Sequence, residues 1–354
     1  MNKIIFEEGD EKKALDFLRN ISAKDKVAIV THTDLDGVSA GKVIFQFVSS
    51  IASKENTEIF FIDYSEMELI TEKVGNDFNK IIFSDLNIDY PNEIKKISDN
   101  SEILIIDHHI FDESLNSDKV IFMNVKGYCA SYLCYYLVSQ LKEIKDISGL
   151  DWLVACASVA DFQFFNNQEF MKEVYEKYGD KFEVVGDFVR KNGKIYELEN
   201  NLSYSIIYFK AKKNLYDFFD ILPEDINNFG EVLKYSNIVK EEIENQMEKF
   251  ENEKENFGDW YFWKINTAFS VGGMIATFLS LKEINKTFII TREEEGHFKV
   301  GARRQDGKVN LSDILKKAVE GIENSNAGGH AKASGATVPV RDIDLFKENL
   351  KKLL

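Results

Sequence analysis

The stretch Ile103-Leu104-Ile105-Ile106-Asp107-His108-His109 decides the fold of this chain and points to its chemistry. Its first four residues are apolar and mostly β-branched, which is typical of a strand buried on both faces of a sheet. A carboxylate and two imidazoles follow the strand at once. A sheet interior does not tolerate such groups without partners, because an unsatisfied buried polar group costs free energy. A metal ion is the partner that these residue types indicate.

Two other stretches repeat this pattern. Residues 27–30 are apolar and run into His32, Asp34 and Asp36, and residues 81–83 run into Asp85. If the three strands are parallel, their carboxyl ends lie at one edge of the sheet, where open α/β folds bind their ligands. Those strand ends would bring four Asp and three His side chains into one small volume.

The order of the predicted elements indicates an α/β fold. Strand patterns at about 26–31, 58–63, 80–84, 102–106 and 121–124 alternate with helical or irregular segments, including helices at 10–21 and 37–53. Alternation of this kind predicts a doubly wound, mostly parallel sheet. Helical patterns dominate from residue 130 onward and include a long charged helix over about 229–254.

The C-terminal part returns to strands and helices. Strand patterns at 260–263, 286–291 and 297–303, and a helix over 311–322 with Asn310 as its N-cap, predict a smaller C-terminal α/β domain. A chain of 354 residues is long enough for two domains with separate cores. We therefore predict a metal-binding domain over residues 1–190, a helical connector over 191–256 and a substrate-binding domain over 257–354.

Composition and charge exclude several classes of protein. The net charge of −16 argues against tight binding to long nucleic-acid duplexes, because that affinity comes mainly from Lys and Arg. No run approaches the roughly eighteen apolar residues of a spanning helix, and the acidic opening does not resemble a secretory signal. We therefore expect a soluble, cytoplasmic protein with no membrane partner. Cys129, Cys134 and Cys156 lack a metal-binding spacing and are expected to be reduced core residues.

The clustered Asp and His side chains suit a divalent cation such as Mn²⁺ or Mg²⁺, and the imidazoles favour Mn²⁺. So many negative ligands make more electrostatic sense with two ions than with one. Two adjacent ions can clamp a phosphoryl group and activate a water, so phosphoester hydrolysis is the first reaction class to consider. Each residue also has a structural interpretation, because Asp36 or Asp85 can cap a helix and Asp161 can simply end one.

Residues 327–335 are a run of small residues around His330, followed by a last strand pattern. Glycines beside a His let backbone amides approach a phosphate, but they also make tight turns, and both interpretations stay open. Arg303 and Arg304 end a predicted strand and can supply a cation for phosphate. Adjacent strand residues face opposite sides, so at least one of the two must point away from whatever the other contacts.

Taken together and in this order, these motifs resemble the DHH phosphoesterase superfamily, in the branch with the DHH-associated C-terminal domain that includes RecJ-type exonucleases and nanoRNases. The motifs are residues 32–37, Asp85, residues 107–109, Asp161, and Gly328-Gly329-His330 with Arg303 before it. The resemblance implies two divalent cations, with Mn²⁺ favoured over Mg²⁺ and Asp85 as the bridge between them. The implied ligands are His32, Asp34, Asp36, Asp85, His108 and Asp161.

The resemblance also implies roles for the remaining motif residues. His109 would contact the scissile phosphate, and Asp107 would orient a histidine, so these two are the predicted catalytic pair. The C-terminal lobe would hold the substrate across a cleft through Arg303, Gly328, Gly329 and His330.

The function that follows is a manganese-dependent phosphodiesterase or exonuclease. Its expected substrates are single-stranded DNA or RNA, or short oligonucleotides, which it would convert to nucleoside monophosphates by two-metal catalysis. The acidic net charge favours short substrates over long ones. Two alternatives stay open: hydrolysis of a small phosphate compound, such as a cyclic dinucleotide or a phosphoadenosine phosphate, and an accessory role among replication-complex proteins.

Overall fold

The chain divides into two compact units, Met1–Ser236 and Asn237–Leu354, and each is described by itself. The computed structural model describes residues 3–75, 77–88, 90–141, 147–186 and 188–353. The domain boundaries expected after residues 190 and 256 remain predictions.

The first unit is built on a five-stranded parallel sheet with the order β2-β1-β3-β4-β5. Its strands are β1 (Val27–His32), β2 (Thr57–Ile62), β3 (Lys80–Ser84), β4 (Glu102–Asp107) and β5 (Val120–Asn124). The order reverses between β1 and β3, which is the point where doubly wound sheets bind ligands. Thr31 pairs with Ser84, and Ser84 pairs with Ile106, so the carboxyl ends of β1, β3 and β4 are level. The predicted doubly wound parallel sheet is confirmed.

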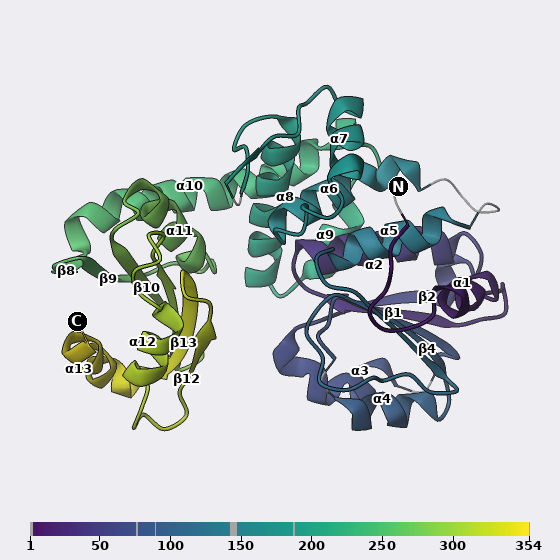
Figure 1. The fold of residues 1–354 in the computed structure, drawn as a ribbon, viewed down its shortest axis with the longest axis horizontal. Helices are drawn as coiled ribbons and strands as arrows, with labels where there is room; N and C mark the ends of the chain where they lie inside the picture. The colour runs from purple at the N-terminus through teal and green to yellow at the C-terminus, as the bar shows by residue number, and fades with distance from the viewer. Residues whose placement is uncertain (1–2, 76, 89, 142–146, 187, 354) are drawn as a thin grey trace. The chain divides into compact units, whose positions relative to one another are not determined.

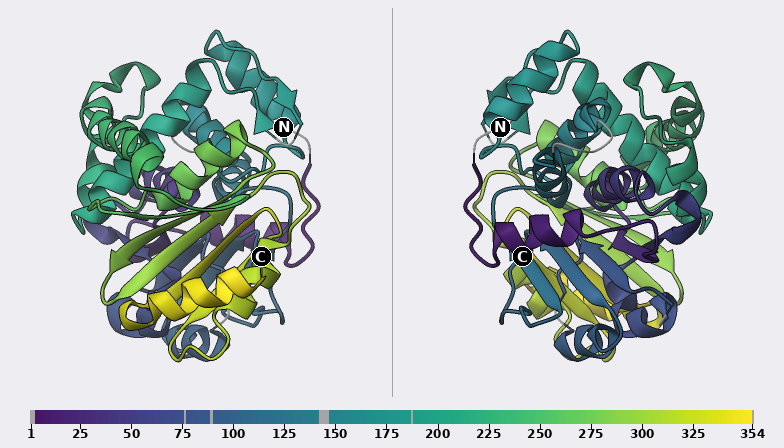
Figure 2. Two further views of the ribbon diagram at one scale, coloured as in Figure 1. Left: turned by 90° about the vertical axis from the view of Figure 1, so that its left-hand side faces the viewer. Right: turned by 90° about the vertical axis from the view of Figure 1, so that its right-hand side faces the viewer.

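Helices cover both faces of this sheet (Figure 1). On one face lie α1 (Glu11–Arg19), α2 (Leu35–Ser49) and α5 (Ala130–Ser139), and on the other lie α3 (Ile70–Val74) and α4 (Pro91–Ser98). The right-hand view of Figure 2 shows α1, in purple, across the strands. Successive strand residues face opposite sides, so Ile82 joins the core beneath α2 and Ile81 the core beneath α4. Burial on both faces is why the strands are continuous apolar runs in the sequence.

A further layer of helices completes the first unit. It consists of α6 (Asp151–Ala160), α7 (Gln168–Lys177), α8 (Lys194–Ala211) and α9 (Leu215–Ile221), with a short hairpin of β6 (Val184–Val185) and β7 (Phe188–Val189). Ile195 and Phe209 of α8 belong to the same apolar core as α2 and α5. The largely helical pattern expected after residue 130 is confirmed, whereas the two-residue strands of the hairpin are too short to give a period-two signal. The three cysteines are free and buried, as predicted.

The second unit begins within the long helix α10 (Gly230–Glu253). It contains a six-stranded mixed sheet with the order β12-β13-β11-β10-β9-β8. The strands are β8 (Glu255–Phe257), β9 (Trp260–Ile265), β10 (Thr287–Glu294), β11 (His297–Arg303), β12 (Asn326–Gly329) and β13 (Ala333–Pro339). The helices are α11 (Gly272–Lys282), α12 (Leu311–Ala318) and α13 (Ile343–Leu353). The left-hand view of Figure 2 shows α13, in yellow, along this sheet, and its Phe346 packs in the core with Phe262. The predicted smaller α/β domain is confirmed.

Two local features of the second unit test predictions made from the sequence. Asn310 caps α12 as predicted, because its side chain accepts from the Ser312 amide at 3.1 Å. The loop expected at 327–335 is instead largely strand, since β12 pairs antiparallel with β13. Glycine-rich segments have low intrinsic strand propensity, so this pairing depends on the partner strand. Short 3₁₀ segments complete the fold: η1 (Lys54–Asn56), η2 (Tyr64–Leu69), η3 (Ser148–Leu150), η4 (Ile226–Asn228) and η5 (Val340–Asp342).

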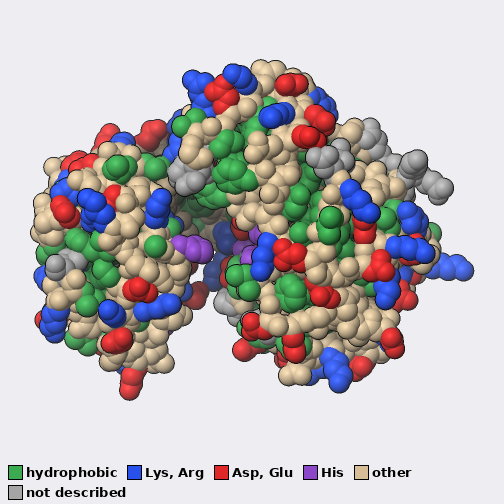
Figure 3. All heavy atoms as spheres, viewed as in Figure 1, with side chains coloured by type: hydrophobic (Ala, Val, Ile, Leu, Met, Phe, Trp, Pro, Cys, Tyr) green, Lys and Arg blue, Asp and Glu red, His purple; other side chains and the backbone are tan. Residues whose placement is uncertain are grey.

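The surface carries both signs of charge. Figure 3 shows Lys and Arg side chains interspersed with Asp and Glu side chains on the face in view, so the net charge of −16 does not form one acidic patch there. Within the described parts of the chain, every helix is too short or too polar to span a bilayer.

Candidate metal centre

Three side chains reach the site from the connection between β1 and α2. His32 is the last residue of β1, Asp34 is the N-cap of α2, and Asp36 lies in the first turn of α2. The Asp34 carboxylate accepts a hydrogen bond from the Gly37 amide at 3.0 Å. A Cβ at Gly37 would lie 2.4 Å from the His32 carbonyl oxygen, so only glycine lets the helix begin directly against the strand. This close connection keeps the three side chains together.

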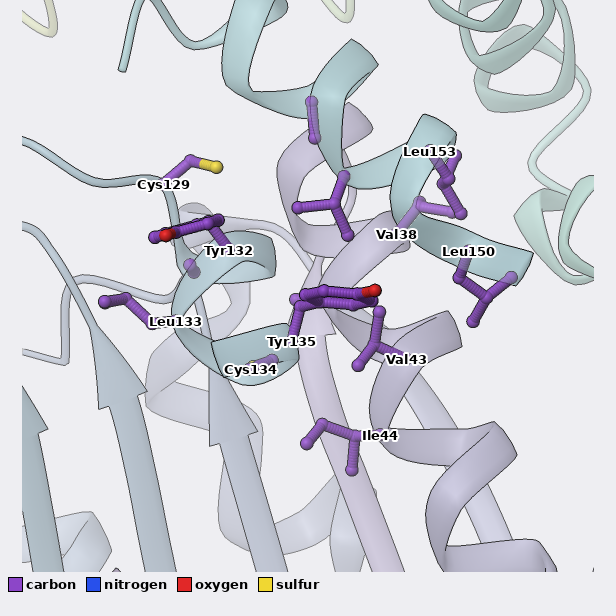
Figure 4. Packing of buried hydrophobic residues seen from close by; sticks show 14 of the residues in the cluster. Val38, Val43, Ile44, Cys129, Tyr132, Leu133, Cys134, Tyr135, Leu150 and Leu153 are labelled. Carbon is purple, nitrogen blue, oxygen red and sulfur yellow. The ribbon is translucent and has the colours of Figure 1, made fainter. Parts of the chain in front are cut away.

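The N-terminus of α5 holds Asp36. The two carboxylate oxygens accept hydrogen bonds from the backbone amides of Ala130 at 2.6 Å and Ser131 at 2.9 Å. Apolar packing holds α5 beside α2, as the labelled side chains Val43 and Tyr135 in Figure 4 show. Asp34 therefore caps α2, whereas Asp36 faces the positive end of the α5 dipole and is only 2% exposed.

Asp85 follows β3 and lies between two histidines. Its Oδ2 is 3.8 Å from His32 Nδ1, and its Oδ1 is 3.2 Å from His108 Nε2. The backbone of Asp85 is left-handed, with φ of 59°, a conformation that a non-glycine residue adopts at a cost. Strain of this kind is often retained at functional sites, where it sets the direction of a side chain. Asp85 thus presents one oxygen to each of two neighbouring groups.

The second group forms around His108. Its Nε2 lies 3.5 Å from Asp161 Oδ2 and 3.8 Å from Asp36 Oδ2. Asp161 is the C-cap of α6, so it ends that helix and also points a carboxylate into the site. Three overlapping groups of ligand atoms, each group within 4.8 Å, result: the triad of His32, Asp34 and Asp85, the triad of Asp36, His108 and Asp161, and a group of Asp85, Asp107, His108 and His109. The structure therefore brings all six predicted metal ligands to one edge of the sheet.

His109 and Asp107 form a pair at the same edge. Asp107 Oδ1 lies 2.7 Å from His109 Nδ1 and also accepts from the His108 amide at 2.8 Å. This geometry suits the orienting role expected of Asp107. The outer nitrogen, His109 Nε2, is 3.2 Å from the hydroxyl oxygen of Tyr64, whose ring stacks on His32 with centroids 4.1 Å apart. Sequence reasoning missed Tyr64, although its position just after β2 places it at the same edge of the sheet.

The electrostatics of the site favour a bound cation. Burial and the neighbouring carboxylates Asp34 and Asp36 raise the pKa of Asp85 well above its ordinary value. Burial and the Asp36 and Asp34 carboxylates likewise raise the pKa of Asp161 to about 9. Burial lowers the pKa of His108. Burial also acts to lower the pKa of His109, but the hydrogen bond with Asp107 and the charges of the nearby carboxylates together outweigh burial and raise it. Carboxylates this close repel one another, and a divalent cation relieves that repulsion.

The residues present fit a divalent metal. The buried oxygens Asp85 Oδ2 and Asp161 Oδ2 make no hydrogen bond to any described residue, although they lie in the middle of the cluster. Unsatisfied buried polar atoms are rare and call for an explanation such as an ion. Carboxylate oxygens with imidazole nitrogens are the donor set expected for Mn²⁺ or Mg²⁺, and the imidazoles favour Mn²⁺.

The second unit carries a separate pocket lined by glycines and cationic side chains. Arg303, Gly328 and Gly329 are among the residues that line it, together with Arg292 and Gly273. Arg303 Nε donates to Thr277 Oγ1 at 3.2 Å and its Nη1 donates to the Ala302 carbonyl at 2.9 Å, so the guanidinium is fixed. Arg304 points away, because Asp306 binds it through two hydrogen bonds of 2.8 and 3.0 Å. The two guanidinium groups therefore contact different parts of the unit, as expected for adjacent residues.

The two glycines of the C-terminal motif differ in why they are glycine. Gly329 has φ of +124°, and a Cβ there would meet the Ala333 carbonyl oxygen at 2.7 Å, so the β12–β13 turn requires it. A Cβ at Gly328 would meet nothing within 4 Å, so the fold does not require glycine at this position. His330 is exposed in the turn after β12 and is not among the lining residues of this pocket.

Comparison with protein families identifies both parts of the chain. The DHH family N-terminal domain matches residues 26–158, and the DHHA1 domain matches residues 263–354. The chain belongs to the DHH family. The predicted membership of this superfamily, in the branch with the associated C-terminal domain, is therefore confirmed. The first match includes β1, β3 and β4 with five of the six candidate ligands, and Asp161 follows three residues after its end.

Relatives of this DHH chain include nucleases. YorK, an SPbeta prophage-derived protein of Bacillus subtilis (strain 168) named as a single-strand DNA-specific exonuclease, is 24% identical over 100 residues. That alignment covers 28% of this chain and 17% of YorK. RecJ from Thermus thermophilus, solved in complex with Mn²⁺, has a TM-score of 0.71 at 14% identity, covering 97% of this chain and 54% of RecJ.

CDC45 from Entamoeba histolytica also has a similar structure, with a TM-score of 0.58 at 9% identity, covering 97% of this chain and 98% of that one. Identities this low establish the fold alone. The RecJ-like fold is thus shown for both units, and this chain spans about half of the RecJ chain.

Proposed function

We propose that this DHH chain is a divalent-metal-dependent phosphodiesterase that releases nucleoside monophosphates from single-stranded nucleic acid, with short oligonucleotides as its preferred substrates. The observation that carries the proposal is the pair of ligand triads that meet at Asp85, which belongs to the first triad and lies 3.2 Å from His108 of the second. Membership of the DHH family and the name of the YorK relative support a nuclease among the phosphoesterase chemistries that such a site can perform.

In this proposal His32, Asp34 and Asp85 would hold one cation, Asp36, His108 and Asp161 would hold another, and Asp85 would lie next to both. A pair of bound divalent cations supplies Lewis-acid activation of the phosphodiester and of the attacking water. The six ligands position that chemistry at the switch point of the sheet, where a substrate has access from solvent. Mn²⁺ is the proposed ion, because two of the six ligands are imidazoles.

His109 contributes from outside the two triads. Asp107 accepts from His109 Nδ1, and Nε2 lies 3.2 Å from the Tyr64 hydroxyl oxygen, so a phosphate oxygen would take the place of that hydroxyl at Nε2. The raised pKa of His109 favours the protonated imidazole, so Nε2 can donate a hydrogen bond to an oxygen of the scissile phosphate. Asp107 acts through His109 by fixing its ring orientation, as carboxylates behind functional imidazoles do.

We also propose that Arg303 and Gly328 bind an anionic part of the substrate in the second unit. Arg303 is fixed by its hydrogen bonds, and a rigid guanidinium suits phosphate well. Short substrates are proposed because the net charge of −16 disfavours a long phosphate backbone, and because the charges in Figure 3 show no extended basic track on that face. His330 remains a predicted substrate contact.

The test is incubation of the protein with Mn²⁺ and 5′-labelled oligonucleotides from two to about twenty nucleotides long, followed by separation of the products. Nucleoside monophosphates from the shortest substrates are expected, at rates that fall with length. Cyclic dinucleotides and a phosphoadenosine phosphate belong in the same panel. Turnover of only those compounds would favour the small-phosphate alternative. No turnover at all, with capture of replication proteins by the intact chain, would favour an accessory role.

The backbone amides of α5 offer a test of the Asp36 ligand. Ala130→Pro removes the amide that donates to Asp36 Oδ2, while proline is tolerated at the first position of a helix. Cys129 is already extended, with φ of −77° and ψ of 155°, as a residue before proline must be. We expect the affinity for Mn²⁺ to fall about 10- to 100-fold, the effect typical of losing a group that orients a ligand.

Isothermal titration with Mn²⁺ measures this loss, and Ala130→Gly is the matched control because it keeps the amide. Unchanged affinity in Ala130→Pro, with an unchanged circular dichroism spectrum, would show that α5 does not position Asp36.

The two motif glycines give a second pair of variants. Gly328→Ala should fold normally, because its Cβ meets nothing within 4 Å, yet raise KM roughly tenfold by narrowing the pocket. Gly329→Ala should instead destabilise the fold by about 1–3 kcal/mol, because of its left-handed backbone and the contact with Ala333. Thermal melts and oligonucleotide kinetics distinguish the two. A normal KM in stable Gly328→Ala would remove this pocket from substrate binding.

A further inference from the structure

Tyr64 lies against two histidines of the site. Its ring stacks on the imidazole of His32, with centroids 4.1 Å apart and planes inclined by 25°. The same ring meets the imidazole of His109 in a T-shaped arrangement, with centroids 5.9 Å apart and planes inclined by 83°. Tyr64 is thus placed between a proposed metal ligand and the histidine proposed to bind phosphate.

The hydroxyl of Tyr64 needs an explanation beyond this stacking, because a phenylalanine ring would stack on His32 equally well. The hydroxyl oxygen lies 3.2 Å from His109 Nε2, within hydrogen-bonding distance. Tyr64 is 38% exposed, so it is not a residue of the apolar core. The hydroxyl therefore marks a place beside His109 where an oxygen atom fits, and a phosphate offers such an oxygen.

The segment that carries Tyr64 is anchored on both sides. Ile62, the last residue of β2, and Met67 of η2 are each 1% exposed and belong to one apolar core. The Asp63 amide donates to a carboxylate oxygen of Glu66 at 3.2 Å, which closes the turn between them. Because the backbone is held in this way, a phosphate oxygen that enters beside the imidazole would displace the hydroxyl by roughly one hydrogen-bond length, about 3 Å, without expelling the ring.

A tyrosine hydroxyl that stays beside a phosphate is a hydrogen-bond donor. The non-bridging oxygens of a phosphodiester carry negative charge, and donors fixed before the reaction stabilise such charge in the transition state. A tyrosine hydroxyl carries its proton at neutral pH, so it donates without adding a charge of its own.

We propose that Tyr64 is a catalytic residue whose hydroxyl donates a hydrogen bond to the scissile phosphate, beside the hydrogen bond from His109 Nε2. This inference rests on the proposed function and adds a second donor to the same site. The stacking of the ring on His32 then has a function of its own, because it directs the hydroxyl towards the phosphate and keeps it there.

Tyr64→Phe removes the hydroxyl and keeps the ring on His32. We expect kcat for a dinucleotide to fall about 10- to 100-fold, the scale of one hydrogen bond to a charged group. The affinity for AMP, measured by isothermal titration in the presence of Mn²⁺, should fall about tenfold, because this product keeps the phosphate that the hydroxyl contacts. The melting temperature and the affinity for Mn²⁺ should stay unchanged.

Tyr178→Phe is the matched control. The Tyr178 hydroxyl donates to Asp151 at 2.7 Å, and Asp151 begins α6 whereas Asp161 ends it. A helix of ten residues is about 15 Å long, so this substitution removes a tyrosine hydroxyl of the same unit far from the phosphate. It should leave kcat and the affinity for AMP unchanged.

The direction of the change in AMP affinity separates the roles that the hydroxyl could have. A hydroxyl that only fills the site before phosphate arrives competes with phosphate, so its removal would strengthen AMP binding and overturn the inference. A loss of kcat matched by an equal loss of Mn²⁺ affinity would show that the hydroxyl supports the metal site instead, and would overturn it as well.

The same measurements separate this inference from the function on which it rests. If the unmodified chain releases no nucleoside monophosphate, the proposed function fails. If the unmodified chain is active and Tyr64→Phe has its kcat and its AMP affinity, the donor role of Tyr64 alone is overturned.

Discussion

Asp85→Asn is expected to lower kcat for oligonucleotide hydrolysis by at least about 100- to 1,000-fold, the size typical of removing one preorganised electrostatic group from an active site. Asp85 Oδ2 lies 3.8 Å from His32 Nδ1 and Oδ1 lies 3.2 Å from His108 Nε2, so its loss should affect both proposed cations. Asn has the same shape and tolerates the left-handed backbone at φ of 59°, so the substitution adds no strain. The effect should therefore be electrostatic rather than structural.

The same substitution should stabilise the metal-free protein. Burial and the surrounding carboxylates raise the pKa of Asp85, which means that the folded state disfavours its ionised form. Asn carries no charge to disfavour. Thermal melts should show a higher melting temperature without metal and a smaller increase when Mn²⁺ is added.

Asp118→Asn is the matched control, because Asp118 is exposed at the opposite end of the sheet, just before β5. Near-normal kcat in Asp85→Asn, together with a normal Mn²⁺-induced increase in melting temperature, would contradict the role given to Asp85.

Metal affinity should depend steeply on pH. The pKa of Asp161 is raised to about 9 by burial and by the Asp36 and Asp34 carboxylates, so at neutral pH the metal-free site holds a proton that a cation must displace. Each displaced proton makes the apparent affinity rise about tenfold per pH unit, which gives roughly a hundredfold between pH 6 and pH 8. Titration in two buffers of different ionisation enthalpy measures the protons released.

The stability of the metal-free fold should depend on pH in the opposite direction to the metal affinity. The Asp161 pKa is higher in the folded chain than its ordinary value of 3.8, so the metal-free protein loses stability as pH rises from about 4 towards about 9. Bound cations should reverse this loss. Asp161→Asn should flatten both dependences, and an affinity for Mn²⁺ that does not change between pH 6 and pH 8 would show that no ligand carboxyl is protonated at rest.

Much of the site could be predicted from the sequence because most of its residues lie at the carboxyl ends of strands. Continuous apolar runs before His32, Asp85 and Asp107 predict buried parallel strands, and parallel strands bring their carboxyl ends to one edge. The register confirms that β1, β3 and β4 end level. Asp161 is different, because it ends a helix and no periodicity marks it as a ligand. Its inclusion came from the order of the family motifs.

The remaining contacts of the site join residues far apart in the chain, and local sequence patterns do not predict such contacts. Asp36 accepts from the amide of Ala130, 94 residues later in the chain, and a backbone amide leaves no trace in the sequence. Tyr64 reaches His109 from a 3₁₀ segment, which has no distinctive residue pattern. The strand β12 exists because β13 pairs with it, not because glycines favour strands.

The most direct test of the account is X-ray diffraction from crystals grown with Mn²⁺, recorded on both sides of the manganese absorption edge. The account predicts two anomalous peaks in the first unit, one among His32, Asp34 and Asp85 and the other among Asp36, His108 and Asp161, with Asp85 contacting both. Peaks elsewhere, or none among these six side chains, would contradict the two-metal centre and the function proposed from it.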